Sequence, residues 1–221
     1  MKTLRFYFKK EGSTVYISHL DTTRFLSRVI KRSGIPVWYT EGFNPHIYLT
    51  FAQPLPLGCA SICESFDLRI IDDNADPMEL AERLNQASSP DLPIFSCGQV
   101  TFAPADIYYS AYQFHFATDE PEFLAQRIGE FLAKESIPAE KKTKRGTKSI
   151  DIALLSADPK ITVEQGYVTL EILLASGTED TLSPILYRTV LSEACGIMSE
   201  CGKILRTAML DQKKTILTPV L

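Results

Sequence analysis

The chain has 221 residues, 45% of them hydrophobic, which suits one large domain or two small ones with a substantial core. Its formal net charge of -4 disfavours a protein that coats nucleic acid, DNA included, through its overall field, but leaves room for a local basic patch. No stretch approaches the roughly eighteen apolar residues of a membrane span, and the N-terminus lacks a secretion signal. We therefore expect a cytoplasmic protein with no membrane partner.

Five cysteines, an odd number, indicate reduced thiols rather than a disulfide framework. Cys59 and Cys63 have C-x3-C spacing, but no third cysteine follows at the spacing of an iron–sulfur cluster. We expect no cluster, metal or other cofactor in this chain.

The first half of the chain begins with a predicted half-buried strand over residues 4–9, in which apolar and charged side chains alternate. A turn and extended residues 15–17 follow. Ser18 is then a suitable N-cap for a helix over 19–33, with Asp21 as its capping partner and Gly34 at its end. The remaining pattern predicts a helix at 77–87 and strands at 35–40, 47–52, 64–71 and 94–102.

The second half repeats this theme without residue-level similarity. It predicts helices at 120–134 and 183–196 and strands at 112–117, 149–155, 168–175 and 203–210. This order predicts an α+β fold of two tandem ferredoxin-like βαββαβ halves with antiparallel sheets. The linker at 103–108, which contains Pro104, is the best boundary and gives halves at 1–105 and 106–221.

Three arginines share one face of the first predicted helix. Arg24, Arg28 and Arg32 follow Asp21 at helical spacing, and the planar guanidinium suits bidentate contact with phosphate or carboxylate. A solvated helix face with an ordinary Asp21–Arg24 pair is the alternative. The excess of positive charge favours an anion site.

Two histidines lie near this helix in the sequence. His19 occupies the helix N-terminus, where the dipole favours the neutral ring, and His46 ends an E-G-F-N-P-H turn. Together with Asp21 and Glu41 they have the residue types of a two-His, carboxylate metal site or a general-base site. Local structural roles for both rings are the alternative, and Asn44 has a sufficient role as a turn residue.

A basic segment stands out in the acidic chain. Five of the eight residues from 141 to 148 are basic, and Gly146 indicates a hairpin tip. A mobile solvated loop and a clamp for the phosphate backbone of nucleic acid both fit this composition.

Five segments form a distinctive series: Y-I-S-H-L-D-x-x-R, R-x-G-I-P-V, E-G-F-N-P-H, F-A-x-P-L-P-x-G and K-x-K-R-G-x-K-x-x-D-I. This series resembles the radical-SAM-associated bacterial family, a domain of unknown function that occurs alone or fused behind a B12-binding radical SAM enzyme. One departure is Ile47-Tyr48, where the family leads us to expect a proline and a basic residue. The resemblance implies partnership with a radical SAM enzyme and an RNA-linked role, and it supplies no catalytic residues.

We therefore expect an accessory RNA-binding module that presents structured RNA, tRNA or rRNA, to a radical SAM modification enzyme and has no activity of its own. Two alternatives stay open: a metal-dependent or His-based hydrolase or nuclease using His19, Glu41 and His46, and a scaffold that binds only its partner protein. The expected phosphate contacts are Arg24, Arg28, Arg32, Lys142, Lys144, Arg145 and Lys148. The expected pocket residues are His19, Asp21, Glu41, Asn44 and His46.

Overall fold

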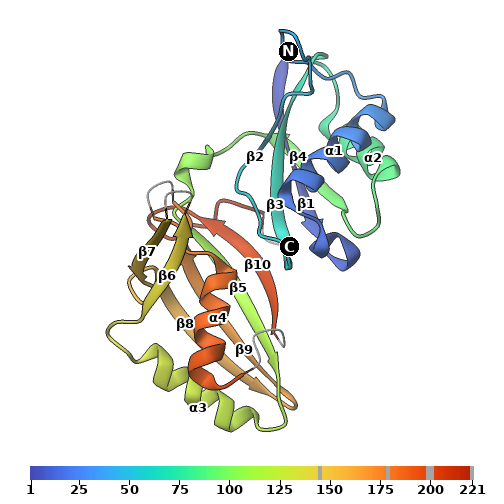
Figure 1. The fold of residues 1–221 in the computed structure, drawn as a ribbon. Coiled ribbons are helices and arrows are strands. Elements are labelled where there is room, and N and C mark those ends of the chain that lie inside the picture. The colour runs from blue at the N-terminus through green and yellow to red at the C-terminus, as the bar shows by residue number, and fades with distance from the viewer. Residues whose placement is uncertain (144–145, 178–179, 198–201, 220–221) are drawn as a thin grey trace. The chain divides into compact units, whose positions relative to one another are not determined.

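The structure is a computed structural model of residues 1–221, and it describes residues 1–143, 146–177, 180–197 and 202–219. The described residues form four α-helices and mostly antiparallel strands (Figure 1), which confirms the predicted α+β class. The chain divides into two compact units, Met1–Pro104 with Pro219 and Ala105–Thr218. Each unit is described by itself below.

The first unit has an antiparallel sheet with strand order β4-β1-β3-β2. Phe6 of β1 lies opposite Phe66 of β3 on one side and Cys97 of β4 on the other, so these three side chains lie on the same face of the sheet. The elements, in chain order, are β1 (Lys2–Lys10), the 3-10 helix η1 (Gly12–Tyr16), α1 (His19–Ser33), β2 (Leu49–Phe51), β3 (Cys59–Ile70), α2 (Pro77–Ala87) and β4 (Ile94–Gln99).

The core of the first unit lies between one face of this sheet and the two helices. The apolar stripe of each helix, such as Leu26 and Leu84, is buried together with alternate residues of β1 and β3. The sheet residues in this cluster are Leu4, Phe6, Phe8, Phe66, Leu68 and Ile70. Each fully buried side chain of this size contributes about 1.5–3 kcal/mol through the hydrophobic effect.

The second unit has an antiparallel sheet with strand order β10-β5-β9-β8, and β6 and β7 form a separate two-stranded ribbon (Figure 1). The rings of Phe114 and Tyr187 lie 5.5 Å apart, so α4 covers the sheet face on which Phe114 lies. Its elements are η2 (Pro104–Asp106), β5 (Tyr109–Ala117), α3 (Pro121–Leu132), β6 (Pro138–Thr143), β7 (Gly146–Asp151), β8 (Ser156–Glu164), β9 (Tyr167–Ala175), α4 (Pro184–Cys195) and β10 (Gly202–Leu210).

Two sequence predictions are wrong in their local structure. Val15 and Tyr16 are not extended but belong to η1, which the hydrogen bonds from Thr14 Oγ1 to the Glu11 and Asp91 carbonyls stabilise, and only Ile17 is extended. The predicted strand at 149–155 ends early, because the Asp151 carboxylate accepts from the backbone N–H of Ala153 and turns the chain. The structure then adds β8, which the sequence did not predict.

The predicted strand at 35–40 contributes only isolated bridges, Val37 to Ile70 and Tyr39 to Ile47. The helices predicted at 19–33 and 77–87 are confirmed residue for residue. None of the described helices is both long enough and apolar enough to cross a bilayer. Cys59 and Cys63 are fully buried in β3, whereas Cys201 lies outside the described residues.

Candidate nucleic-acid interface

The N-terminus of α1 is held by a short capping box, as the sequence predicted. The Ser18 hydroxyl accepts from the backbone N–H of Asp21 at 3.1 Å and donates to the Asp21 carboxylate at 2.7 Å. This hydrogen bond from Ser18 is the main reason that the pKa of Asp21 lies below its ordinary value. Asp21 is therefore a capping carboxylate on an exposed helix end.

The three arginines of α1 have three different environments. Arg24 contacts Asp21 at 3.4 Å in a pair whose side chains are more than half exposed, so it is weakly held. Arg32 donates to the carbonyl of Ala87 at the end of α2 and is used in helix packing. Arg28 is exposed and makes no hydrogen bond or ion pair within the described chain. Of the predicted stripe, Arg28 and Arg24 can meet an anion without breaking the fold.

The two histidines of the first unit have local partners. The ring of His19 packs edge-on against Phe51, with centroids 4.7 Å apart. His46 Nδ1 lies 3.1 Å from the Asn44 carbonyl, which only accepts, so Nδ1 carries the proton and Nε2 is the acceptor in the neutral ring. Thr40 Oγ1 lies 3.0 Å from the same Nδ1. The contacts of His46 with Thr40 and Asn44 therefore stabilise the loop that ends at His46.

The loop closed by His46 is fully exposed at its tip. Glu41 and Asn44 both lie on the exposed tip, and the Phe43 side chain is at 105% of its reference exposure. Within the described parts of the chain, no three His, Cys, Asp or Glu residues gather to hold a metal ion. His19, Asp21, Glu41 and His46 consequently do not form the cluster that a metal-dependent site needs.

An arginine–aromatic cluster lies beside this loop and consists of Trp38, Tyr48 and Arg69, which is near the end of β3. The guanidinium carbon of Arg69 lies 4.9 Å from the ring centroid of Trp38 and 4.3 Å from that of Tyr48. The two rings themselves are 6.0 Å apart in an edge arrangement. All three side chains are half-buried, so they present one cation and two π faces at the surface. No pattern in the sequence marked Arg69 as a partner of these two rings.

The base of the β6–β7 hairpin is anchored in the second unit. Ile137, Ala139 and Ile152 are buried, and the Asp151 carboxylate accepts from the backbone N–H of Ile137 at 2.9 Å. A hydrogen bond from the Ser136 side chain, followed by this backbone bond, lowers the pKa of Asp151. The hairpin is fixed at its root and exposed from 146 to 149.

The described lysines of the hairpin lie on both of its faces. Lys141 pairs directly with Lys148 across the strands, so these two share a face, and Lys142 lies on the other. Lys141 Nζ donates to the Thr181 carbonyl at 2.5 Å, so the Lys141 ammonium group is directed toward Thr181. Lys142 and Lys148 are exposed and make no hydrogen bond or ion pair to described residues. Lys144 and Arg145 lie outside the described residues.

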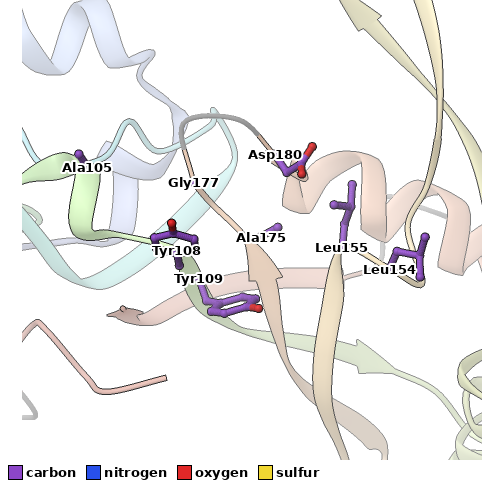
Figure 2. A pocket seen from close by; sticks show the side chains of 8 residues that line it. All are labelled: Ala105, Tyr108, Tyr109, Leu154, Leu155, Ala175, Gly177 and Asp180. Carbon is purple, nitrogen blue, oxygen red and sulfur yellow. The ribbon is translucent and has the colours of Figure 1, made fainter. Parts of the chain in front are cut away.

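A cavity of about 290 Å³ lies in the second unit. Figure 2 shows Tyr108 and Tyr109 on one side, Leu154, Leu155 and Asp180 on the other, and Ala175 and Gly177 between them, with Ala105 further along. No pattern in the sequence marks these residues, because four separate segments supply them. None of the predicted pocket residues lines this cavity.

Comparison with known proteins shows to which family the chain belongs. A family model described as an uncharacterized protein conserved in bacteria, DUF2344, matches residues 3–184. The match includes the whole of α1, the loop ending at His46 and the β6–β7 hairpin. A search of curated proteins gave no match. Because the family model covers most of its length, the chain belongs to this bacterial family.

Proposed function

We propose that the chain is an accessory RNA-binding module that works with a radical SAM enzyme in tRNA or rRNA modification. The observation that carries the RNA half of the proposal is the β6–β7 hairpin, whose lysines lie on both faces of an anchored, exposed ribbon. Cations on both faces of a ribbon can contact phosphates on both sides of a nucleic-acid loop, and the resemblance of the sequence to radical-SAM-associated proteins favours RNA.

The charge of the hairpin is local. The segment from 138 to 151 has five basic and two acidic residues, whereas the chain as a whole is net negative by four. An overall field therefore does not draw the protein to polyanions, and binding has to be focused on this segment. Lys141 and Lys148 face each other across the ribbon, and the hydrogen bond of Lys141 to the Thr181 carbonyl leaves Lys148 as the exposed cation of this face.

The first unit supplies a second phosphate-binding surface in this proposal. Arg28, with Arg24 one turn away, offers exposed guanidinium groups on α1. Arg69 between Trp38 and Tyr48 offers a cation beside aromatic faces, the combination on which unpaired bases stack. The exposed ring of Phe43 is a further stacking surface.

We also propose that both units are ferredoxin-like halves. The strand orders β4-β1-β3-β2 and β10-β5-β9-β8 support this, since both place the first strand and the third at the centre. In this description β6 and β7 are an insertion after α3 of the second unit. The insertion is where the basic segment lies, as expected for a binding feature added to a scaffold.

The partner half of the proposal rests on the resemblance of the sequence to radical-SAM-associated proteins. The chemical step belongs to the radical SAM enzyme, and this chain holds the RNA. Gel filtration of the chain with the radical SAM enzyme of its own bacterium, with and without tRNA, tests this division. Co-elution that tRNA strengthens supports it, and separate elution in both cases contradicts it.

Charge reversal tests the RNA half. Lys142→Glu with Lys148→Glu removes the two exposed hairpin cations that the structure describes, and Lys203→Glu with Lys213→Glu makes the same change of net charge at exposed sites elsewhere in the second unit. We expect the hairpin variant to bind tRNA at least about tenfold more weakly and the control to bind nearly as well as wild type. Equal loss in both variants would show that net charge, not the hairpin, determines binding.

A further inference from the structure

We infer that the cavity in Figure 2 is a pocket for one unpaired guanine of the bound RNA, an inference that rests on the proposed RNA binding by the hairpin. The cavity is close to the lower end of the range for small-ligand sites, about 300 Å³, which suits a single base.

The cavity and the hairpin are joined through two short links. Asp180, in the wall of the cavity, precedes Thr181, whose carbonyl accepts the hydrogen bond from Lys141 of β6 at 2.5 Å. Leu154 and Leu155, in the same wall, lie three and four residues after the end of β7. A strand of RNA held by the hairpin therefore has its neighbouring nucleotide within reach of the cavity.

Backbone hydrogen bonds hold the walls in place. Tyr108 donates to the Leu210 carbonyl at 2.9 Å and accepts from Ser176 at 2.8 Å, so both ends of its peptide are fixed. The backbone N–H of Ala175, which lies between the two walls, donates to the Leu155 carbonyl at 2.9 Å. This bond holds Ala175 to the wall that contains Leu155. A preformed site of this kind loses little conformational entropy when a ligand enters.

The tyrosine side of the cavity suits a planar ring. Tyr108 is 43% exposed and Tyr109 is half-buried beside it, while Leu154, 81% exposed, offers an apolar surface across the cavity. The small side chain of Ala175, and Gly177 with none, leave the space between the walls open. Bases bind proteins by stacking on aromatic rings in this way when they are unpaired.

Asp180 selects among the bases. Its carboxylate is exposed and only accepts hydrogen bonds, and no described residue donates to it. Guanine presents two adjacent donors, N1–H and the N2 amino group, which match the two oxygens of a carboxylate. Adenine and cytosine present one amino donor next to a ring nitrogen that only accepts, and uracil presents one donor flanked by carbonyl oxygens. The carboxylate therefore favours guanine.

Fluorescence anisotropy with labelled single-stranded RNA decamers tests the pocket. The decamers are uridine-rich and differ in one central base, which is guanine, inosine or adenine; inosine lacks the N2 amino group. We expect wild type to bind the guanine decamer about tenfold more tightly than the adenine decamer, with inosine between them. Asp180→Asn should remove this preference, and Asp119→Asn, an isosteric change at another exposed site of the second unit, should keep it.

Salt-sensitive binding that is equal for the three decamers would overturn the guanine pocket while leaving the hairpin as an RNA site. Absence of binding to every RNA would overturn the proposed function and this inference together. Tyr108→Leu should weaken binding of all three decamers with an unchanged melting temperature, because it removes the stacking surface and leaves the backbone bonds of residue 108. Unchanged affinity in this variant would also contradict the pocket.

Discussion

Arg32 and Arg83 hold the ends of each other's helices. Arg32 of α1 donates to the carbonyl of Ala87, the last residue of α2, and Arg83 of α2 donates to the carbonyl of Ser33, the last residue of α1, at 3.0 Å. Each guanidinium thus meets the negative end of the neighbouring helix dipole. Gly34 caps α1 in the left-handed conformation, with φ of 66°, and leaves room for Arg83.

These exchanged contacts predict that Arg32 of α1 stabilises the fold, whereas Arg28 of the same helix is used in binding. Arg83→Ala should lower the free energy of unfolding by about 1 kcal/mol, because the Ser33 carbonyl at the end of α1 then loses its charged donor. Arg32→Ala should also be destabilising, whereas Arg28→Ala should leave the melting temperature unchanged and weaken RNA binding. Thermal unfolding and RNA titration of the three variants measure this. A destabilised Arg28→Ala protein would show that Arg28 is structural.

The arginine–aromatic cluster predicts a fluorescence change, since Trp38 is the only tryptophan of the chain. Arg69→Gln removes the cation from between Trp38 and Tyr48 and should lower the free energy of unfolding by about 1 kcal/mol. Binding of RNA to the first unit should quench the emission of Trp38 in wild type and less in this variant. Lys31→Gln, at an exposed site of α1 outside the cluster, is the control, and identical quenching in both variants would exclude the cluster from the RNA site.

The loop from Glu41 to His46 predicts a localised loss of order when its fastening is removed. Thr40 Oγ1 accepts from the backbone N–H of His46 at 3.1 Å and contacts the ring at 3.0 Å. Thr40→Val removes both contacts, so the amides of this loop should exchange with solvent faster while the rest of the unit is unchanged. Glu41→Gln, at an exposed site of the same loop, should have no effect. Unchanged exchange in Thr40→Val would contradict the role given to His46.

His115 predicts a loss of stability in acid. Burial, and then the nearby positive charge of Lys203, lower the pKa of His115 below its ordinary value of 6.5, against the weaker opposite effect of Glu164 and Glu171. The unfolded chain therefore takes up this proton at a higher pH than the folded chain does. As the pH falls below about 6.5, the free energy of unfolding falls, until His115 is protonated in the folded chain too.

His115→Gln should lose less stability than wild type over this range, because glutamine keeps a polar group beside Thr169 and does not titrate. Thermal unfolding at several pH values between about 7.5 and 5 measures the difference. Parallel curves for the two proteins would show that His115 titrates alike in the folded and unfolded chain.

The sequence was sufficient for elements that are determined locally. Helix α1 could be predicted in full because Ser18, the apolar spacing and Gly34 act within the segment itself. The strand β8 could not, since its side chains are half or fully exposed and show no apolar alternation. The predicted exposed side of β1 is another error: Arg5 is fully buried, with a bidentate ion pair to Asp67 and Phe102 over its guanidinium.

The candidate site shows the same limit. The sequence marked Lys142 and Lys148 as cations, but only the register with Lys141 shows that they lie on opposite faces of a ribbon. Asp180 carries no sequence signal, because its neighbourhood depends on hydrogen bonds between segments far apart in the chain. Residues that act through long-range pairing have to be read from the fold.

The salt dependence of tRNA binding tests the central claim most directly. Log Kd for wild type and for Lys142→Ala with Lys148→Ala is measured against the logarithm of the KCl concentration, from about 50 to 300 mM. The account predicts steep weakening of wild-type binding with salt. In the variant the slope should be shallower by about 1.5, because two phosphate contacts are lost. Equal slopes for the two proteins, or binding that salt does not weaken, would contradict RNA recognition by the hairpin.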